Sequence, residues 1–165
     1  MSGRTHAMVP AGLAALLFQG DPLITLTAAL SGLAPDIDEP ESVIGQRFWM
    51  FAWWMKHVFG HRTVSHSFVM VAIVALLGFC VSLPGPIIGA MCLGVLSHVI
   101  LDAYSGGVYV WWPSKTRWVL GRYSVYGIMD RVLLFLGVLL TVGMLIRRVQ
   151  MEMIDVRPVT SVVGG

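Results

Sequence analysis

His98 and Asp102 stand four residues apart near the end of an apolar run from Pro86 to Tyr104. On a helix, residues four apart lie on one face, roughly 6 Å from each other, so the imidazole and the carboxylate can converge on one bound ion. The two side chains could instead form a buried pair that hydrogen-bonds to itself and fixes the helix. Ionisable residues in a membrane-spanning segment are costly and usually mark a functional site. The pattern therefore favours a pair of metal ligands.

Further imidazoles and carboxylates stand at the ends of other apolar segments. They are His6, Asp36, Asp38, His61 and His66, with Asp130 as an additional candidate. Neutral imidazole with carboxylate suits zinc, manganese or iron, whereas ligands that are all oxygen indicate magnesium or calcium. The set could hold one divalent ion, with zinc as the first choice, or two ions that share Asp36 or Asp102 as a bridge. Two ions can activate a hydroxide and stabilise the charge developing on an ester or phosphoester oxygen.

Other polar side chains near this set have competing interpretations. Arg62 offers a fork of donors to a phosphate or a carboxylate, or is an ordinary interfacial charge. Ser65 precedes His66 and could be a nucleophile, but sequence neighbours seldom have the required geometry, and the chain has no glycine-bounded nucleophile elbow. Ser67 more simply caps the next helix. His57 lies in a Trp-rich segment, which favours an interfacial histidine over a ligand.

The composition is that of a membrane protein. The chain has 165 residues, of which 56% are hydrophobic and only 12% charged, far outside the average of soluble domains, and its mean hydropathy is +0.78. The net charge of +2 and the lack of a contiguous basic run argue against a nucleic-acid partner. Cys80 and Cys92 fall inside apolar runs, as small hydrophobic residues do. The first residues imitate a signal peptide, and we expect them to be retained as part of the fold.

The apolar segments predict an all-α fold. Residues 7–18 and 23–34 are each shorter than the ~20 residues of a bilayer crossing, and Gln19-Gly20-Asp21-Pro22 breaks a helix between them, so we expect a helical hairpin. The other expected elements are an aromatic interfacial helix over 48–59, apolar segments over 68–83 and 87–104, an interfacial loop over 105–127, a last span over 128–146 and a loose tail over 149–165. The predicted fold class is a polytopic membrane helical bundle with a short N-terminal hairpin, an interfacial helix and about three full spans, in a single domain over 1–165.

This topology decides where the candidate ligands lie. A hairpin returns the chain to the side from which it started, so His6 shares one face with Asp36 and Asp38. The segment 48–59 does not cross, and the next two segments go away and come back, which delivers His98 and Asp102 to the same side. Most of the Lys and Arg residues share that side, and the positive-inside rule then places it in the cytoplasm. A solvated loop surface that happens to contain histidines is the competing interpretation.

Four ordered motifs resemble the YdjM-type family of inner-membrane proteins, to which metal-dependent hydrolase activity is attributed. The motifs are Thr5-His6, Ala34-Pro35-Asp36-Ile37-Asp38 with Ser42, the segment from His61 to Ser67, and Ser97-His98 with Asp102, Gly106-Gly107 and Trp112-Pro113. The resemblance covers residues 5–114 and implies a metal site made of His6, Asp36, Asp38, His61, His66, His98 and Asp102. Ala34 and Thr63-Val64-Ser65 depart from the family's usual residues but leave the candidate ligands in place.

We therefore expect a hydrolase of the cell inner membrane that acts on an ester or phosphoester, with Asp38, Arg62 and Asp102 as catalytic residues. A position at headgroup depth favours a lipid or lipid-linked substrate, and membrane lipids, other membrane proteins or a second copy as partners. One rival is a non-catalytic, metal-stabilised subunit of a larger membrane assembly, which would have no open coordination position. Another is an ion transporter, for which segments 68–83 and 133–146 offer scarcely any ionisable residue.

Overall fold

A computed structural model describes residues 1–60 and 62–155. Within these ranges the chain is helical, with seven α-helices, one 3₁₀ helix and no strand beyond a single bridge between Val108 and Trp118. The all-α prediction is confirmed. The elements are α1 (Gly3–Leu17), α2 (Pro22–Ser31), η1 (Ala34–Asp38), α3 (Val43–Arg47), α4 (Trp49–Val58), α5 (Phe68–Cys80), α6 (Gly85–Ser105) and α7 (Ile128–Asp155).

The N-terminal hairpin is present as predicted. Helix α1 ends at Leu17, and the backbone reverses through Gln19 and Gly20, which both have positive φ. The carboxylate of Asp21 accepts a hydrogen bond from the backbone N–H of Ile24 (3.0 Å) and caps α2, which begins with Pro22. Capping and the proline together fix the start of the second helix, so the chain returns along α1.

Small residues allow the helices to cross closely. Pro10 lies inside α1 and has no N–H to donate to the carbonyl of His6, and a side chain at Gly32 would collide with that carbonyl and with the Pro10 ring. Gly94 of α6 is equally tight, because a Cβ there would lie 2.6 Å from the carbonyl oxygen of Ala28. Close approach through small residues is the usual mode of helix packing in membranes. It brings α1, α2 and α6 into contact at one place.

Two helices in the described ranges are long and apolar enough to cross a membrane, α6 and α7. Helix α5 has 13 residues, and at 1.5 Å per residue it spans only about 20 Å, less than the ~30 Å hydrocarbon core. Length therefore does not support α5 as a third full span. Helix α7 continues beyond the predicted end at 146 and ends at Asp155. Within this extension Arg148 pairs with Glu152, which lies one helical turn later (2.9 Å). Residues 149–155 are thus helical rather than loose, and the rest of the predicted tail lies outside the described residues.

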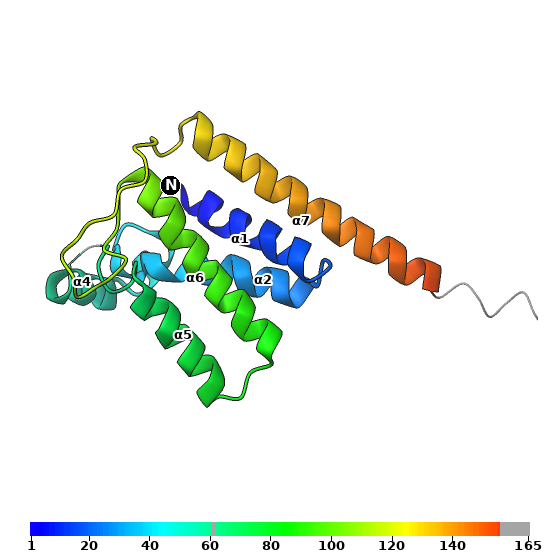
Figure 1. Ribbon diagram of the computed structural model, residues 1–165, viewed down its shortest axis with the longest axis horizontal. Coiled ribbons are helices and arrows are strands. Elements are labelled where there is room, and N and C mark those ends of the chain that lie inside the picture. Colours follow the sequence, from blue (N-terminus) through cyan, green and yellow to red (C-terminus); the bar gives the residue numbers. More distant parts are fainter. Residues whose placement is uncertain (61, 156–165) are drawn as a thin grey trace, which may run out of the picture.

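The polar connections gather at one end of the molecule (Figure 1). The N-terminus, the C-terminal end of α6 and the start of α7 lie close together there, beside η1, α4 and the long loop that follows α6. The α1–α2 and α5–α6 turns lie at the far ends of their helices. The chain reversal predicted from the break before α2 therefore has the expected consequence for the arrangement of the helices.

Candidate metal centre

Four donor atoms from three segments of the chain converge at the polar end. Nε2 of His98 on α6 lies 3.1 Å from Nε2 of His66, 3.5 Å from Oδ1 of Asp36 and 3.8 Å from Oδ2 of Asp102. Nε2 of His66 lies 3.4 Å from Asp102 Oδ2 and 3.9 Å from Asp36 Oδ1. Ligand atoms bound tetrahedrally to zinc at 2.0–2.2 Å are about 3.3–3.6 Å apart. The five distances, from 3.1 to 3.9 Å, are close to this spacing, so these donors could approach one ion.

Hydrogen bonds behind the two imidazoles determine which ring nitrogens carry protons. Nδ1 of His98 lies 2.6 Å from the carbonyl oxygen of Gly32 and must donate to it. The hydroxyl of Ser65 donates to Asp38 Oδ2 (2.7 Å), so its oxygen, 2.9 Å from His66 Nδ1, accepts the proton of that ring. With both rings neutral, the two Nε2 atoms, 3.1 Å apart, each present a lone pair to the other. Two facing lone pairs cannot share a hydrogen bond, and a cation between them resolves the conflict.

His6 adds a second layer to this centre. Its ring stacks on that of His98 with centroids 3.8 Å apart, and its Nε2 lies 3.1 Å from Oδ1 of Asp102. Its Nδ1 is buried without a hydrogen-bond partner among the described residues. The triads His6, His98, Asp102 and Asp36, His66, His98 could each hold an ion. Because Nε2 of His98 has one lone pair, it serves only one ion at a time.

The predicted catalytic residues have different surroundings. Asp102 Oδ1 accepts from the Met1 amino group (3.0 Å), while Oδ2 pairs with Nη2 of Arg62 (3.1 Å). Arg62 has a positive φ of 59° and its backbone N–H donates to Asp38 Oδ2 (3.1 Å). Asp38 Oδ2 thus lies behind His66, 3.8 Å from Nδ1. Asp102 therefore lies beside Nε2 of the His66 ring, whereas Asp38 lies on the Nδ1 side of the same ring.

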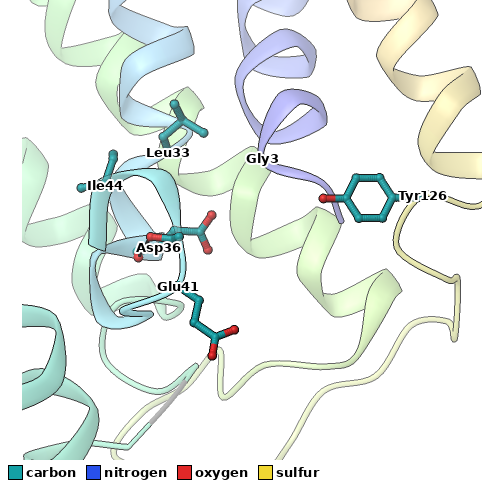
Figure 2. A pocket seen from close by; sticks show the side chains of 7 residues that line it. Gly3, Leu33, Asp36, Glu41, Ile44 and Tyr126 are labelled. Atoms are coloured by element: carbon teal, nitrogen blue, oxygen red, sulfur yellow. Dashed lines mark hydrogen bonds between the residues drawn. The ribbon is translucent and has the colours of Figure 1, made fainter. Parts of the chain in front are cut away.

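Burial makes one carboxylate the accessible member of the centre. His66 and His98 are fully buried and Asp102 is 1% exposed, whereas the Asp36 side chain is 24% exposed. Asp36 points into a cavity of about 180 Å³, which is also lined by Gly3, Leu33, Glu41, Ser42, Ile44 and Tyr126 (Figure 2). Burial raises the pKa of Asp36 above its ordinary value. Asp36 thus lines the cavity and also lies 3.5 Å from Nε2 of His98, so it connects the cavity with the buried donor atoms.

Two further candidates, His57 and Asp130, do not join these donors. His57 is exposed on α4, and its Nδ1 lies 2.8 Å from the Trp53 carbonyl oxygen. The carboxylate of Asp130 accepts from the backbone N–H of Ser2 (2.9 Å) and so ties α7 to the start of α1. The predicted ligand His61 lies outside the described residues.

Sequence reasoning missed the groups that orient the imidazoles. In the sequence Ser65 suggests a nucleophile, and the carbonyl of Gly32 carries no side-chain signal at all. The adjacency of Ser65 to His66 was the one available hint. The contacts of Ser65 with His66 and of Gly32 with His98 depend on the three-dimensional arrangement of η1, α2 and α6, which local sequence signals do not determine.

Comparisons with known proteins give a consistent result. The sequence model of a family described as YdjM inner membrane protein matches residues 1–160. The uncharacterized protein YvsG of Bacillus subtilis is 32% identical over 145 residues, which cover 85% of this chain and 91% of that protein. The inner membrane protein YdjM of Escherichia coli is 37% identical over 119 residues, which cover 67% of this chain but only 60% of that protein. No solved structure matches the chain.

Proposed function

The chain belongs to the YdjM family of inner membrane proteins, and on this premise we propose that it is a metal-dependent hydrolase working at the membrane surface. Its two long apolar helices fit an inner-membrane location. In the proposal the chain is a single multi-pass domain over 1–165, with α5 as a short third crossing. The donor cluster then faces the cytoplasm. This orientation is supported by the Lys and Arg residues near the N-terminus, in the connections around α4 and after α6, and at the start of α7, against Arg147 and Arg148 in the second half of α7.

The proposed ion is held by His66, His98, Asp36 and Asp102. Two imidazoles with two carboxylates suit zinc, and manganese or iron can use the same donors. An ion of this kind lowers the pKa of a coordinated water and polarises an ester or phosphoester oxygen. Since the two triads share one His98 lone pair, the proposal is one ion at a time, with His6 supporting Asp102 from behind rather than serving as an independent ligand.

Each nearby residue has a proposed task that follows from its contacts. Asp36 reaches the cavity, so it is placed to orient an attacking water and to take its proton. Asp38 acts through Ser65 to hold the His66 ring. Arg62 neutralises Asp102 and, being 26% exposed, can also contact an anionic substrate group. Of the catalytic residues expected from the sequence, Asp38 becomes a positioning residue in this proposal.

A lipid or lipid-linked substrate is favoured by the depth of the centre. Trp49, Trp53 and Trp54 of the neighbouring helix α4 are exposed, and exposed tryptophans concentrate at the lipid headgroup level. Helix α4 lies at the same end of the molecule as η1, the start of α5 and the C-terminal end of α6 (Figure 1), the segments that supply the donors. An ester or phosphoester bond of a membrane lipid would therefore lie at the height of the cavity beside Asp36.

The observation that carries the proposal is the pair of buried Nε2 atoms of His66 and His98, 3.1 Å apart, beside the carboxylates of Asp36 and Asp102. The test begins with elemental analysis of the purified full-length chain. The loaded and the chelator-stripped protein are then incubated with a panel of phospholipids and with bis(p-nitrophenyl) phosphate. We expect stoichiometric metal and hydrolysis that disappears on stripping and returns with zinc. Metal without turnover of any ester or phosphoester would refute the hydrolase.

The second candidate is a metal-stabilised, non-catalytic subunit of a membrane assembly. Its supporting observation is that four protein donors lie close together, enough to fill all four positions of a structural zinc site, whereas catalytic sites keep an open position. Hydrolysis requires Asp36 to yield its place to water. Cobalt substitution distinguishes the two, since the visible spectrum of the loaded protein changes on addition of a phosphate analogue only if a ligand position opens.

A further inference from the structure

Two apolar hollows lie on either side of Ile100 of α6. One, of about 260 Å³, is enclosed by α6, the start of α5 and the loop after α6, and its walls include Leu96, Val110 and Trp118. The other, of about 360 Å³, lies between α6 and the start of α7, and its walls include Tyr104 and Leu133. Ile100 lines both hollows and is itself 45% exposed. The hollows are therefore neighbours separated by one side chain.

The paired hollows are distinct from the metal centre. Successive residues of an α-helix are rotated by about 100°, so Ile100 lies nearly opposite both His98 and Asp102 around the axis of α6. His98 and Asp102 are buried against α1, α2 and the segment before α5. Ile100 lies on the lipid side of the same helix. None of the four proposed donors lines either hollow, and the nearest link is Met1, which lines the second hollow and whose amino group bonds to Asp102 Oδ1 (3.0 Å).

Tyr104 and Tyr123 line the second hollow, and Arg122 precedes Tyr123 in the loop that crosses the end of α6. The backbone N–H groups of Leu120 and Tyr123 donate to the carbonyls of Ala103 and Tyr104, at 2.9 Å and 3.1 Å, and so hold the loop across the last turn of α6. The rings of Tyr104 and Tyr123 lie 6.1 Å apart. Arg122, between the two anchors, is exposed, and the structure shows no ion pair for it within the described ranges. A cation and two phenols thus lie where α6 leaves the apolar layer.

We propose that this surface binds one phospholipid with two acyl chains and an anionic headgroup. One chain lies in each hollow, Ile100 separates them, and Arg122 with the tyrosine hydroxyls binds the phosphate. Two chains suit the two hollows, the apolar walls suit hydrocarbon, and basic groups at the membrane surface attract anionic lipids. A peptide would leave its backbone groups unpaired against the apolar walls of both hollows. The site does not depend on hydrolysis, because the lipid is a resident ligand on the far side of α6.

The test measures lipid retained by the full chain, using native mass spectrometry after exchange into nanodiscs of dioleoyl phosphatidylglycerol or dioleoyl phosphatidylcholine. Leu96→Trp fills the first hollow and Leu133→Trp the second, while Leu139→Trp, on the exposed surface of α7, is the matched control. We expect one phosphatidylglycerol on the wild type and on the control, and loss of it from both filling variants. Metal content should be the same in all four proteins, which separates loss of lipid from misfolding.

Arg122→Gln tests the headgroup contact separately. Removing one surface cation should lower the preference for phosphatidylglycerol over phosphatidylcholine by about fivefold, while the hollows stay open. Retention of lipid by both filling variants would overturn the proposal. So would an unchanged preference in Arg122→Gln, or a mass showing that a second copy of the chain, instead of lipid, covers this surface.

Discussion

Replacing Ser65 with alanine should weaken metal binding although Ser65 is not itself a ligand. Its hydroxyl donates to Asp38 Oδ2 (2.7 Å) and its oxygen accepts from His66 Nδ1 (2.9 Å). Without the hydroxyl, Nδ1 is left 3.8 Å from Asp38 Oδ2, beyond hydrogen-bonding distance. The ring then loses the contact that directs its Nε2 lone pair at the other donors.

The size of the effect follows from the role of such supporting groups. Removing a hydrogen-bond partner behind a metal-ligating histidine typically costs 10–100-fold in metal affinity, about 1.4–2.7 kcal/mol. Asp38→Asn should fall in the same range, because an amide oxygen is a weaker acceptor for the Ser65 hydroxyl than a carboxylate. The Ser65→Ala, Asp38→Asn double variant should lose little more than either single variant, since the two residues act through one contact.

Ser67→Ala is the matched control, since Ser67 flanks His66 on its other side. Its hydroxyl donates to the Val64 carbonyl (2.7 Å) and accepts from the Val69 N–H (3.2 Å), so it caps α5. Loss of the cap costs about 1 kcal/mol of stability but leaves the His66 contact intact. Competition between the purified protein and a chromophoric chelator for zinc measures each affinity. Equal affinities in Ser65→Ala and wild type, or an equal loss in Ser67→Ala, would refute the reasoning.

Three further outcomes are expected. His98→Ala should remove stoichiometric metal while His57→Ala retains it, as determined by elemental analysis. Gly32→Ala should destabilise the folded chain by about 1–3 kcal/mol because its Cβ meets the carbonyl of α1, whereas Gly143→Ala, which meets no atom within 4 Å, should be neutral or stabilising by up to about 1 kcal/mol in thermal denaturation. Burial raises the pKa of Asp36 above 3.8, so the folded state binds this proton more tightly than the unfolded state. The unfolding free energy of the metal-free protein should therefore decrease as the pH rises from 3.8 through the raised pKa, and Asp36→Asn should flatten that segment of the profile.

The hairpin and the position of the polar end could be predicted from the sequence because they depend on local signals. Gly20 and Pro22 interrupt two apolar runs that are each too short to cross a bilayer, and chain reversal then determines which segments share a side. The C-terminal end of helix α5 was harder to predict, since the apolar run 68–83 includes the turn residues Val81, Ser82 and Leu83. The helix itself ends at Cys80, and periodicity alone does not locate that end.

The different roles of Asp36 and Asp38 could not be predicted from the sequence motif. The motif suggests that both carboxylates point at one ion, but residues 34–38 form a 3₁₀ helix. With three residues per turn, side chains two positions apart are rotated by about 240° and diverge. Asp36 consequently lies at the Nε2 side of His66 and His98, whereas Asp38 Oδ2 lies on the Nδ1 side of His66.

Gly32 determines both how the helices pack and how the donor atoms are oriented. Because Gly32 has no side chain, the end of α2 can lie against the carbonyl of His6, to which Pro10 has no N–H to donate. The carbonyl of Gly32 itself accepts the Nδ1 proton of His98. Any shift of α2 away from α1 would therefore move the acceptor that fixes the His98 tautomer. An ion bound by His66 and His98 in turn ties the segment before α5 to α6. Metal binding should thus stabilise the same helix crossing that creates the site, and a thermal transition that did not rise on zinc addition would contradict this coupling.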